Sequence, residues 1–109
     1  MLSAQELATL RMSAEGWVVS GDVTAATDTL KAAVASKTHY ITDIILSAEA
    51  DGEVEINDGT TNYLEKVCLL AGTAIAIHPH VFLRTAANKK IDLIGTNGKV
   101  YYTVCGFTN

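Results

Sequence analysis

Short runs of β-branched and other apolar residues follow one another between residues 17 and 107, and turn-forming residues separate them. The clearest turns are Asn-Asp-Gly at 57–59 and Thr-Asn-Gly at 96–98, because these residues accept the backbone of a tight hairpin. Before the first of these turns the pattern alternates, with Val54 and Ile56 expected to point into a core. Closely spaced short strands predict an all-β protein, an antiparallel β-sandwich with jelly-roll wiring.

No helical run lies between the expected strands, so a parallel sheet is not predicted. The stretch at 27–37 is ambiguous from its residues alone, since its alanines favour a helix by propensity. The other expected strands occupy residues 16–22, 39–48, 52–58, 63–72, 74–85, 89–95 and 99–107.

The first residues of the chain carry the signals of a helix start. Ser3 is the expected N-cap, and Glu6 three residues later completes a capping box. Leu2 and Leu7 occupy the two positions of a hydrophobic staple around that cap. The segment therefore predicts a short N-terminal α-helix, which needs packing against something to persist.

We expect that helix to end at Gly16, which divides the chain into an N-terminal helical arm, 1–16, and a β-sandwich domain, 17–109. The arm has a narrow apolar stripe that includes Leu7 and Leu10. It could lie on its own domain or dock on a neighbouring subunit. The candidate interface residues are Leu2, Leu7, Leu10 and Trp17. Trp17 has a second interpretation as a cap on its own core.

The charge balance narrows the class of partner. Of the 109 residues, 49% are hydrophobic and 18% are charged, and the net charge is −4. A nucleic-acid-binding protein needs a basic face to displace counterions from phosphates, so that class is not expected. So few charges indicate that a partner covers part of the surface.

The first sixteen residues lack a basic segment followed by an apolar core, so no signal peptide is expected, and no apolar run is long enough for a membrane span. We therefore expect synthesis in a cytoplasm and no membrane partner. Cys68 and Cys105 are far apart in sequence and are expected to be free thiols in that reducing compartment.

One motif points to a metalloenzyme. Gly72, five further residues, His78 and His80 match the opening of a cupin metal site. That motif continues with a glutamate four or five residues after the second histidine, where this chain has Arg84 and Thr85. The match is therefore incomplete.

His39 is the only other histidine and would have to supply a third ligand from another strand, since a catalytic metal normally has three protein ligands. Pro79, between the two histidines, indicates a strand edge or break. No nucleophile elbow or phosphate-binding glycine loop is present. We expect no metal, no cofactor, no catalytic residue and no enzymatic activity.

From about residue 28 to residue 107 the chain resembles a family of small phage virion β-sandwich domains, found in head decoration proteins and in tail-fibre or receptor-binding parts. The similar segments, in order, are TLKAAVASKTHYITDIILSA, VEINDGT, HPHVFLRTAANKKIDLI and GKVYYTVCGF. The resemblance implies that residues 27–35 of the ambiguous stretch are extended. It also implies that the proline between His78 and His80 makes a turn. The family has no common active site, and residues 1–16 have no fixed counterpart in it.

What the resemblance implies is a virion structural protein, most directly a capsid decoration (cement) protein that binds the major capsid protein lattice. Members are commonly homotrimers. A tail-fibre or receptor-binding module that recognises a host-surface glycan is the alternative, and a cupin-like metalloenzyme is a further one. An exposed aromatic cluster in a concave site would favour the second role, and bound metal the third.

Overall fold

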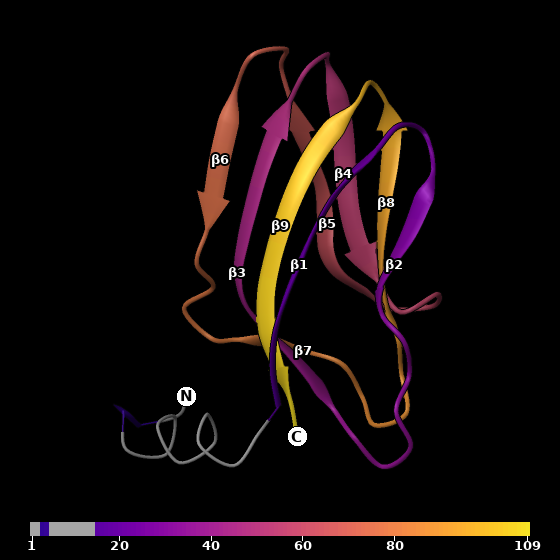
Figure 1. The fold of residues 1–109 in the computed structure, drawn as a ribbon, viewed down its shortest axis with the longest axis vertical. Helices are drawn as coiled ribbons and strands as arrows, with labels where there is room; N and C mark the ends of the chain where they lie inside the picture. Colours follow the sequence, from indigo (N-terminus) through magenta and orange to yellow (C-terminus); the bar gives the residue numbers. More distant parts are fainter. Residues whose placement is uncertain (1–2, 5–14) are drawn as a thin grey trace.

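The structure is a computed structural model that describes residues 3–4 and 15–109. Nine β-strands form two layers (Figure 1). Their bounds are β1 Glu15–Val23, β2 Thr27–Lys31, β3 His39–Ala48, β4 Gly52–Asn57, β5 Asn62–Leu69, β6 Ala74–Ile77, β7 Leu83–Arg84, β8 Ile91–Asn97 and β9 Val100–Thr108. The predicted all-β antiparallel sandwich is confirmed for the described residues.

The strands are divided between two sheets. Sheet A has the order β1-β9-β3-β6, with β7 also paired to β3, and sheet B has the order β2-β8-β4-β5. Every pairing is antiparallel. As a consequence β1 and β2 lie at one lateral side of the sandwich, and β6 and β5 lie at the other (Figure 1).

The core lies between the two sheets and is aliphatic. Val54 and Ile56 are fully buried, as their alternation with glutamates predicts. The other side chains with no exposed surface among the hydrophobic residues are Ile44, Leu46, Ile91, Leu93, Val100 and Val104. They come from the central strands of both sheets, so the core depends on pairings between residues far apart in sequence.

Three boundaries differ from the sequence prediction. The expected helix end at Gly16 is wrong, because β1 begins at Glu15 and pairs with the end of β9. The expected strand at 74–85 is broken after Ile77, where Pro79 lacks the N–H that a ladder needs. The extended conformation implied for 27–35 holds for β2, and residues 32–38 form a loop. The predicted N-terminal helix otherwise lies outside the described residues.

Candidate interaction surface

The two histidines of the cupin-like motif lie in the loop that joins β6 to β7, and both are exposed. His78 forms an ion pair and hydrogen bond with Asp43 of β3, Nδ1 to Oδ1 at 2.5 Å. This loop contains Pro79, which fits the turn that the sequence resemblance implies.

His39 is fully buried at the start of β3, and both of its ring nitrogens have partners within the protein. Nε2–H donates to the carbonyl of Ala32 at 2.8 Å, and Nδ1 lies 2.7 Å from Thr108 Oγ1. The Trp17 indole N–H donates to that same hydroxyl at 3.1 Å. The simplest assignment that satisfies every group is a neutral imidazole that accepts from Thr108, with no lone pair left for a metal.

The three histidines therefore do not converge. Among residues 3–4 and 15–109, no group of three or more His, Cys, Asp and Glu side chains could hold a metal ion. The absence of a metal in the protein itself remains a prediction.

Trp17, a predicted interface residue, packs against its own core. Its ring meets that of His39 edge-on, with the centroids 6.4 Å apart, and Lys31 Nζ lies 5.6 Å from its centroid. A Cβ added to Gly106 would lie 2.5 Å from Trp17 Cζ2, so the indole lies directly on a glycine of β9. The side chain is thus a cap over one end of the core. Leu2, Leu7 and Leu10 lie outside the described residues.

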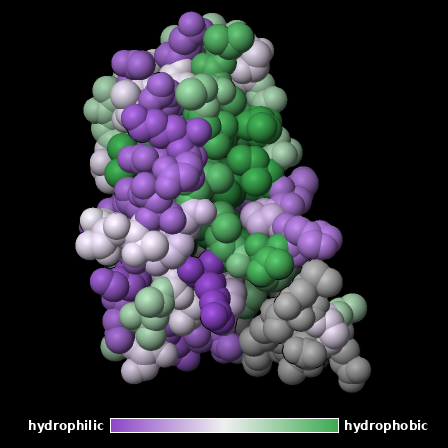
Figure 2. All heavy atoms as spheres, turned by 180° about the vertical axis from the view of Figure 1, so that it is seen from behind, coloured by the Kyte–Doolittle hydropathy of each residue, from purple (hydrophilic) through white to green (hydrophobic). Residues whose placement is uncertain are grey.

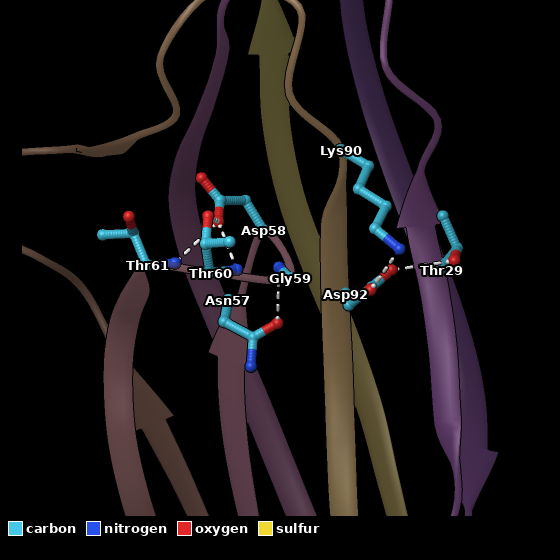
Figure 3. Close-up of polar contacts among 8 residues, drawn as sticks. All are labelled: Thr29, Asn57, Asp58, Gly59, Thr60, Thr61, Lys90 and Asp92. Atoms are coloured by element: carbon cyan, nitrogen blue, oxygen red, sulfur yellow. Dashed lines mark hydrogen bonds and ion pairs between the residues drawn. The ribbon is translucent and has the colours of Figure 1, made fainter.

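The turn that joins β4 to β5 is built around the buried carboxylate of Asp58 (Figure 3). One oxygen accepts from the backbone N–H groups of Thr60 and Thr61, at 2.9 and 2.7 Å, and from the Thr60 hydroxyl. The other accepts from the Tyr63 hydroxyl at 2.6 Å. These bonds, those from Thr61 and Tyr63 first, lower the pKa of Asp58 well below its ordinary value.

The partner phenol responds in the opposite direction. Burial and then the hydrogen bond to Asp58 raise the pKa of Tyr63 to about 12. Gly59, which has φ +98°, supplies the left-handed residue that the turn needs, and its N–H donates to Asn57 Oδ1 at 3.0 Å. The cluster is therefore a saturated structural turn and offers no reactive group.

A second buried acid, Asp92 of β8, lies beside it on sheet B (Figure 3). It accepts from the Thr29 hydroxyl at 2.8 Å and pairs with Lys90 Nζ at 2.9 Å. This carboxylate links β8 to β2 and is fully partnered. Neither acid has the geometry of a general acid or base that could meet a substrate.

The two lateral sides of the sandwich differ in how well they cover the core. On the β1–β2 side, Val23 and Leu30 are 3% and 5% exposed. The Tyr102 hydroxyl donates to Asp28 at 2.8 Å there, and burial followed by that bond raises the pKa of Tyr102 to about 12. Side chains from both sheets meet at this side, and we call it the closed side.

The β5–β6 side is not covered in this way. Ile75 and Ile77 of β6 stand opposite Leu46 and Ile44 of β3, and residues paired across a ladder share one face. They therefore point toward the core, yet Ile75 is 40% exposed while its partner Leu46 is fully buried. Leu64 and Val67 of β5 are only partly buried, and Leu70, just after β5, is 68% exposed. We call this the open side, defined by Leu64, Val67, Leu70, Ile75 and Ile77.

The open side also lacks charge. Residues 67–83 contain no Asp, Glu, Lys or Arg. Figure 2 shows a hydrophobic band running along the length of the molecule beside a hydrophilic face. Edge strands in soluble proteins usually carry charges that prevent pairing with other chains, and β6, with the sequence AIAI, has none.

The outer faces of the two sheets also differ in the kinds of exposed side chain that they carry. On sheet B the outward residues of β4 are Glu53 and Glu55, and Lys66 pairs with Glu53 across to β5. On sheet A, Val18 of β1 and Ile45 of β3 are 67% and 47% exposed. The exposed apolar side chains therefore include those of the open side and, on the outer face of sheet A, Val18 and Ile45. The described residues form no catalytic constellation beside them.

Sequence reasoning did not single out the residues of the open side. The signal that could have found them is the run of seventeen residues without a formal charge, 67–83. Of the candidate interface residues that the sequence suggested, Leu2, Leu7 and Leu10 lie outside the described part of the chain. Trp17 packs against the core of its own domain.

No protein-family model matches the chain, and no curated protein matches it. Among solved structures, the Drosophila NLP core, whose structure concerns pentamer formation and histone binding, is 22% identical with a TM-score of 0.54, covering 84% of this chain and 97% of that one. A structure of Bacillus endospore appendages, described as disulfide-linked pili, is 12% identical with a TM-score of 0.50, covering 87% and 83%. A pentameric capsid protein from metagenomic phage sequences is 17% identical with a TM-score of 0.42, covering 84% and 60%.

At these identities the first two likenesses show a shared β-sandwich fold and nothing about function, and the third is too weak to bear on this chain. No helix in the described residues is long and apolar enough to cross a membrane.

Proposed function

We propose that this chain is a structural protein of a phage particle, a capsid decoration protein that binds the major capsid protein. The observation that carries the proposal is the uncovered apolar surface of an otherwise well-formed sandwich, with Ile75 pointing toward the core and still 40% exposed. A contiguous apolar surface on a folded domain marks a site for another protein. The resemblance to phage virion domains supplies the class of partner. The proposal includes no catalytic role and no cofactor.

The strand order supports the finer fold assignment. The position of β9 between β1 and β3 in sheet A, and of β8 between β2 and β4 in sheet B, supports jelly-roll wiring as part of this proposal. Capsid and lectin domains are among the uses of that wiring, so this assignment agrees with both the decoration role and the tail-fibre alternative.

The proposed protein is a homo-oligomer, and the resemblance favours a trimer. Several copies held together each present one contact to the capsid, so a weak contact at each copy gives firm binding overall. Sedimentation equilibrium distinguishes a trimer from a pentamer, the assembly named for the Drosophila NLP core. A monomer at all concentrations would contradict this part of the proposal.

The N-terminal segment is the proposed capsid contact. Removal of residues 1–14, which stops before β1, should leave a folded sandwich that no longer decorates heads. Changing Leu7 and Leu10 together to Asp should have the same effect, because two carboxylates would abolish the apolar stripe. Both residues lie outside the described part of the chain, so this contact is tested only by experiment.

The assay is co-sedimentation of each variant with undecorated heads, with a melting curve to establish that the variant is folded. Decoration by wild type and its loss in both variants is the expected result. Normal decoration by the folded truncated protein would refute the arm as the contact. Binding of wild type to host cells and not to heads would refute the decoration role in favour of the tail-fibre module.

A further inference from the structure

We infer that the open side of one copy packs against the β1 edge and the adjoining outer face of sheet A in a second copy, so that the copies close into a ring. The inference rests on the proposed homo-oligomer and names the two surfaces that form it. The first surface is the open side, and the second is the β1 edge with the exposed side chain of Val18.

The open side needs an apolar occupant because its residues belong to the core. Ile75 and Ile77 continue the buried rows of Leu46 and Ile44 by one strand, yet Ile75 is 40% exposed and Ile77 is only partly buried. Exposed aliphatic surface of this kind is stabilised by removal from water, at about 25 cal/mol per Å². A charged or strongly hydrated partner surface would not provide this stabilisation, because it would not remove the aliphatic surface from water.

Two exposed apolar patches at different places point to a head-to-tail contact. The open side lies at the β6 edge of sheet A, and Val18 lies on β1 at its opposite edge. A contact between two identical open sides would leave Val18 in water. A contact between one patch and the other covers both in every copy, and it forms a closed ring if the rotation is suitable.

Strand direction agrees with this arrangement. The four main strands of sheet A alternate in direction, so β6 runs opposite to β1. When copies stand side by side in the same orientation, β6 of one copy meets β1 of the next as an antiparallel neighbour. Both strands are sheet edges among the described residues, and an antiparallel arrangement is the one that edge strands most readily accept.

The charges at the two edges are complementary. The ladder registers place Gly16, Phe107, Tyr40 and Arg84 in one row across sheet A, from the β1 edge to β7. Glu15 adjoins that row at the β1 edge. Glu15 and Arg84 are both exposed, and neither forms an ion pair with a described residue. In a ring of copies at one height, Arg84 of each copy meets Glu15 of the next.

The acidic residues nearest the Val18 patch do not prevent this contact. Asp43 already holds His78 and accepts from the Thr42 hydroxyl, and Asp22 lies near the far end of β1, opposite Tyr101. The outer face of sheet B keeps its glutamates toward solvent in such a ring.

The test is the mass of the full-length protein and its variants by sedimentation velocity. Ile75→Lys and Val18→Lys should each reduce the assembly to the 11.6 kDa monomer, because each buries a lysine in the same interface from opposite partners. Thr96→Lys, at an exposed position of β8 in sheet B, is the matched control and should keep the wild-type mass. Leu70→Lys, outside any strand, replaces Ile75→Lys if the latter does not fold.

Mixing the two monomeric variants tests the head-to-tail geometry. Each variant keeps one intact patch, so an equimolar mixture should form heterodimers and no larger ring. If Val18→Lys assembles like wild type while Ile75→Lys is a monomer, the contact joins two open sides, and the inference is overturned.

Charge reversal gives an independent readout. Glu15→Arg and Arg84→Glu should each weaken assembly by about three- to tenfold in dissociation constant, and the double variant should regain wild-type assembly. Additive weakening in the double variant would overturn the proposed pairing. A wild-type oligomer unaffected by the Ile75, Leu70 and Val18 variants would refute these surfaces and leave the homo-oligomer standing. A wild-type monomer would refute both.

Discussion

Both lateral sides of this sandwich are built from aliphatic residues, but they differ in how completely these side chains are buried. At the β1–β2 side, Val23 and Leu30 are buried, a tyrosine–aspartate hydrogen bond joins the two sheets, and Trp17 caps one end. At the β5–β6 side, core-facing isoleucines are partly exposed to solvent. The difference teaches that an incomplete core can be a binding surface, because the missing layer is supplied by another molecule.

The two sides also hold their edge strands by different means. On the closed side, packing secures the edge. On the open side, β5 is fixed to β4 by the Asp58 turn, where four hydrogen bonds converge on one carboxylate. Stability and assembly should therefore respond to different substitutions on the two sides.

The largest loss of stability is expected at Gly106 of β9, where neighbouring atoms leave no room for a side chain. A Cβ at Gly106 would lie 2.1 Å from the Tyr40 carbonyl oxygen and 2.5 Å from Trp17 Cζ2. Gly106→Ala should lower the free energy of unfolding by about 3 kcal/mol or more, since the nearest atom belongs to the backbone. Urea unfolding measures it, with Gly16→Ala as the control because its new Cβ would lie 3.9 Å from the nearest atom. Equal effects from the two substitutions would contradict this packing.

The next effect compares one aliphatic residue from each side. Leu30→Ala should cost about 3 kcal/mol of unfolding free energy, because Leu30 is buried and leaves a cavity. Ile75→Ala should cost the monomer only about 1 kcal/mol, because its side chain is already 40% exposed. Chemical denaturation at the lowest practical concentration makes the comparison. A larger loss for Ile75→Ala would mean that the open side is an ordinary part of the core.

The Asp58 turn should show a pH-dependent effect of about 2 kcal/mol. The pKa of Asp58 is lowered in the folded protein, so its contribution to stability is present above the unfolded pKa, near 4, and is lost as pH falls below it. Asp58→Asn should therefore be less stable than wild type at pH 7, and the gap should narrow toward pH 2. Glu55→Gln, on the outer face of β4, is the control.

Unfolding free energies of wild type, Asp58→Asn and Glu55→Gln across that pH range provide the measurement. If the difference in unfolding free energy between wild type and Asp58→Asn stays constant from pH 7 to pH 2, the ionised Asp58 carboxylate does not stabilise the turn.

The smallest effect is expected at the exposed loop after β6. Replacement of both His78 and His80 with Asn should change unfolding free energy by less than about 0.5 kcal/mol, because both side chains are exposed. Elemental analysis of purified wild type should find no stoichiometric zinc, iron or manganese. Tight metal binding that the double variant loses would restore the cupin hypothesis.

The parts of the fold that the sequence predicted are those set by local signals. Val54 and Ile56 alternate with glutamates and end at an Asn-Asp-Gly turn, so their strand and its buried face were predictable. The strand expected at 74–85 ends at Ile77, and Pro79 indicated this break in the sequence. Trp17 could not be assigned, because a lone tryptophan serves equally well as a core cap and an interface anchor.

The open side was not predictable from local pattern. Ile75 is 40% exposed on β6, which is an edge strand of sheet A. That position follows from pairings between strands distant in the chain, which periodicity does not encode. Only the absence of charge from 67–83 marks the region in the sequence.

Amide hydrogen exchange as a function of protein concentration tests the central claim most directly, because it follows both sides in one sample. Our account predicts that amides of β6 exchange more slowly as concentration rises and the open side is covered. Amides of β2, on the closed side, should keep constant protection. Exchange in β6 that is independent of concentration, in a sample shown by sedimentation to be assembled, would contradict the claim that another copy covers the open side.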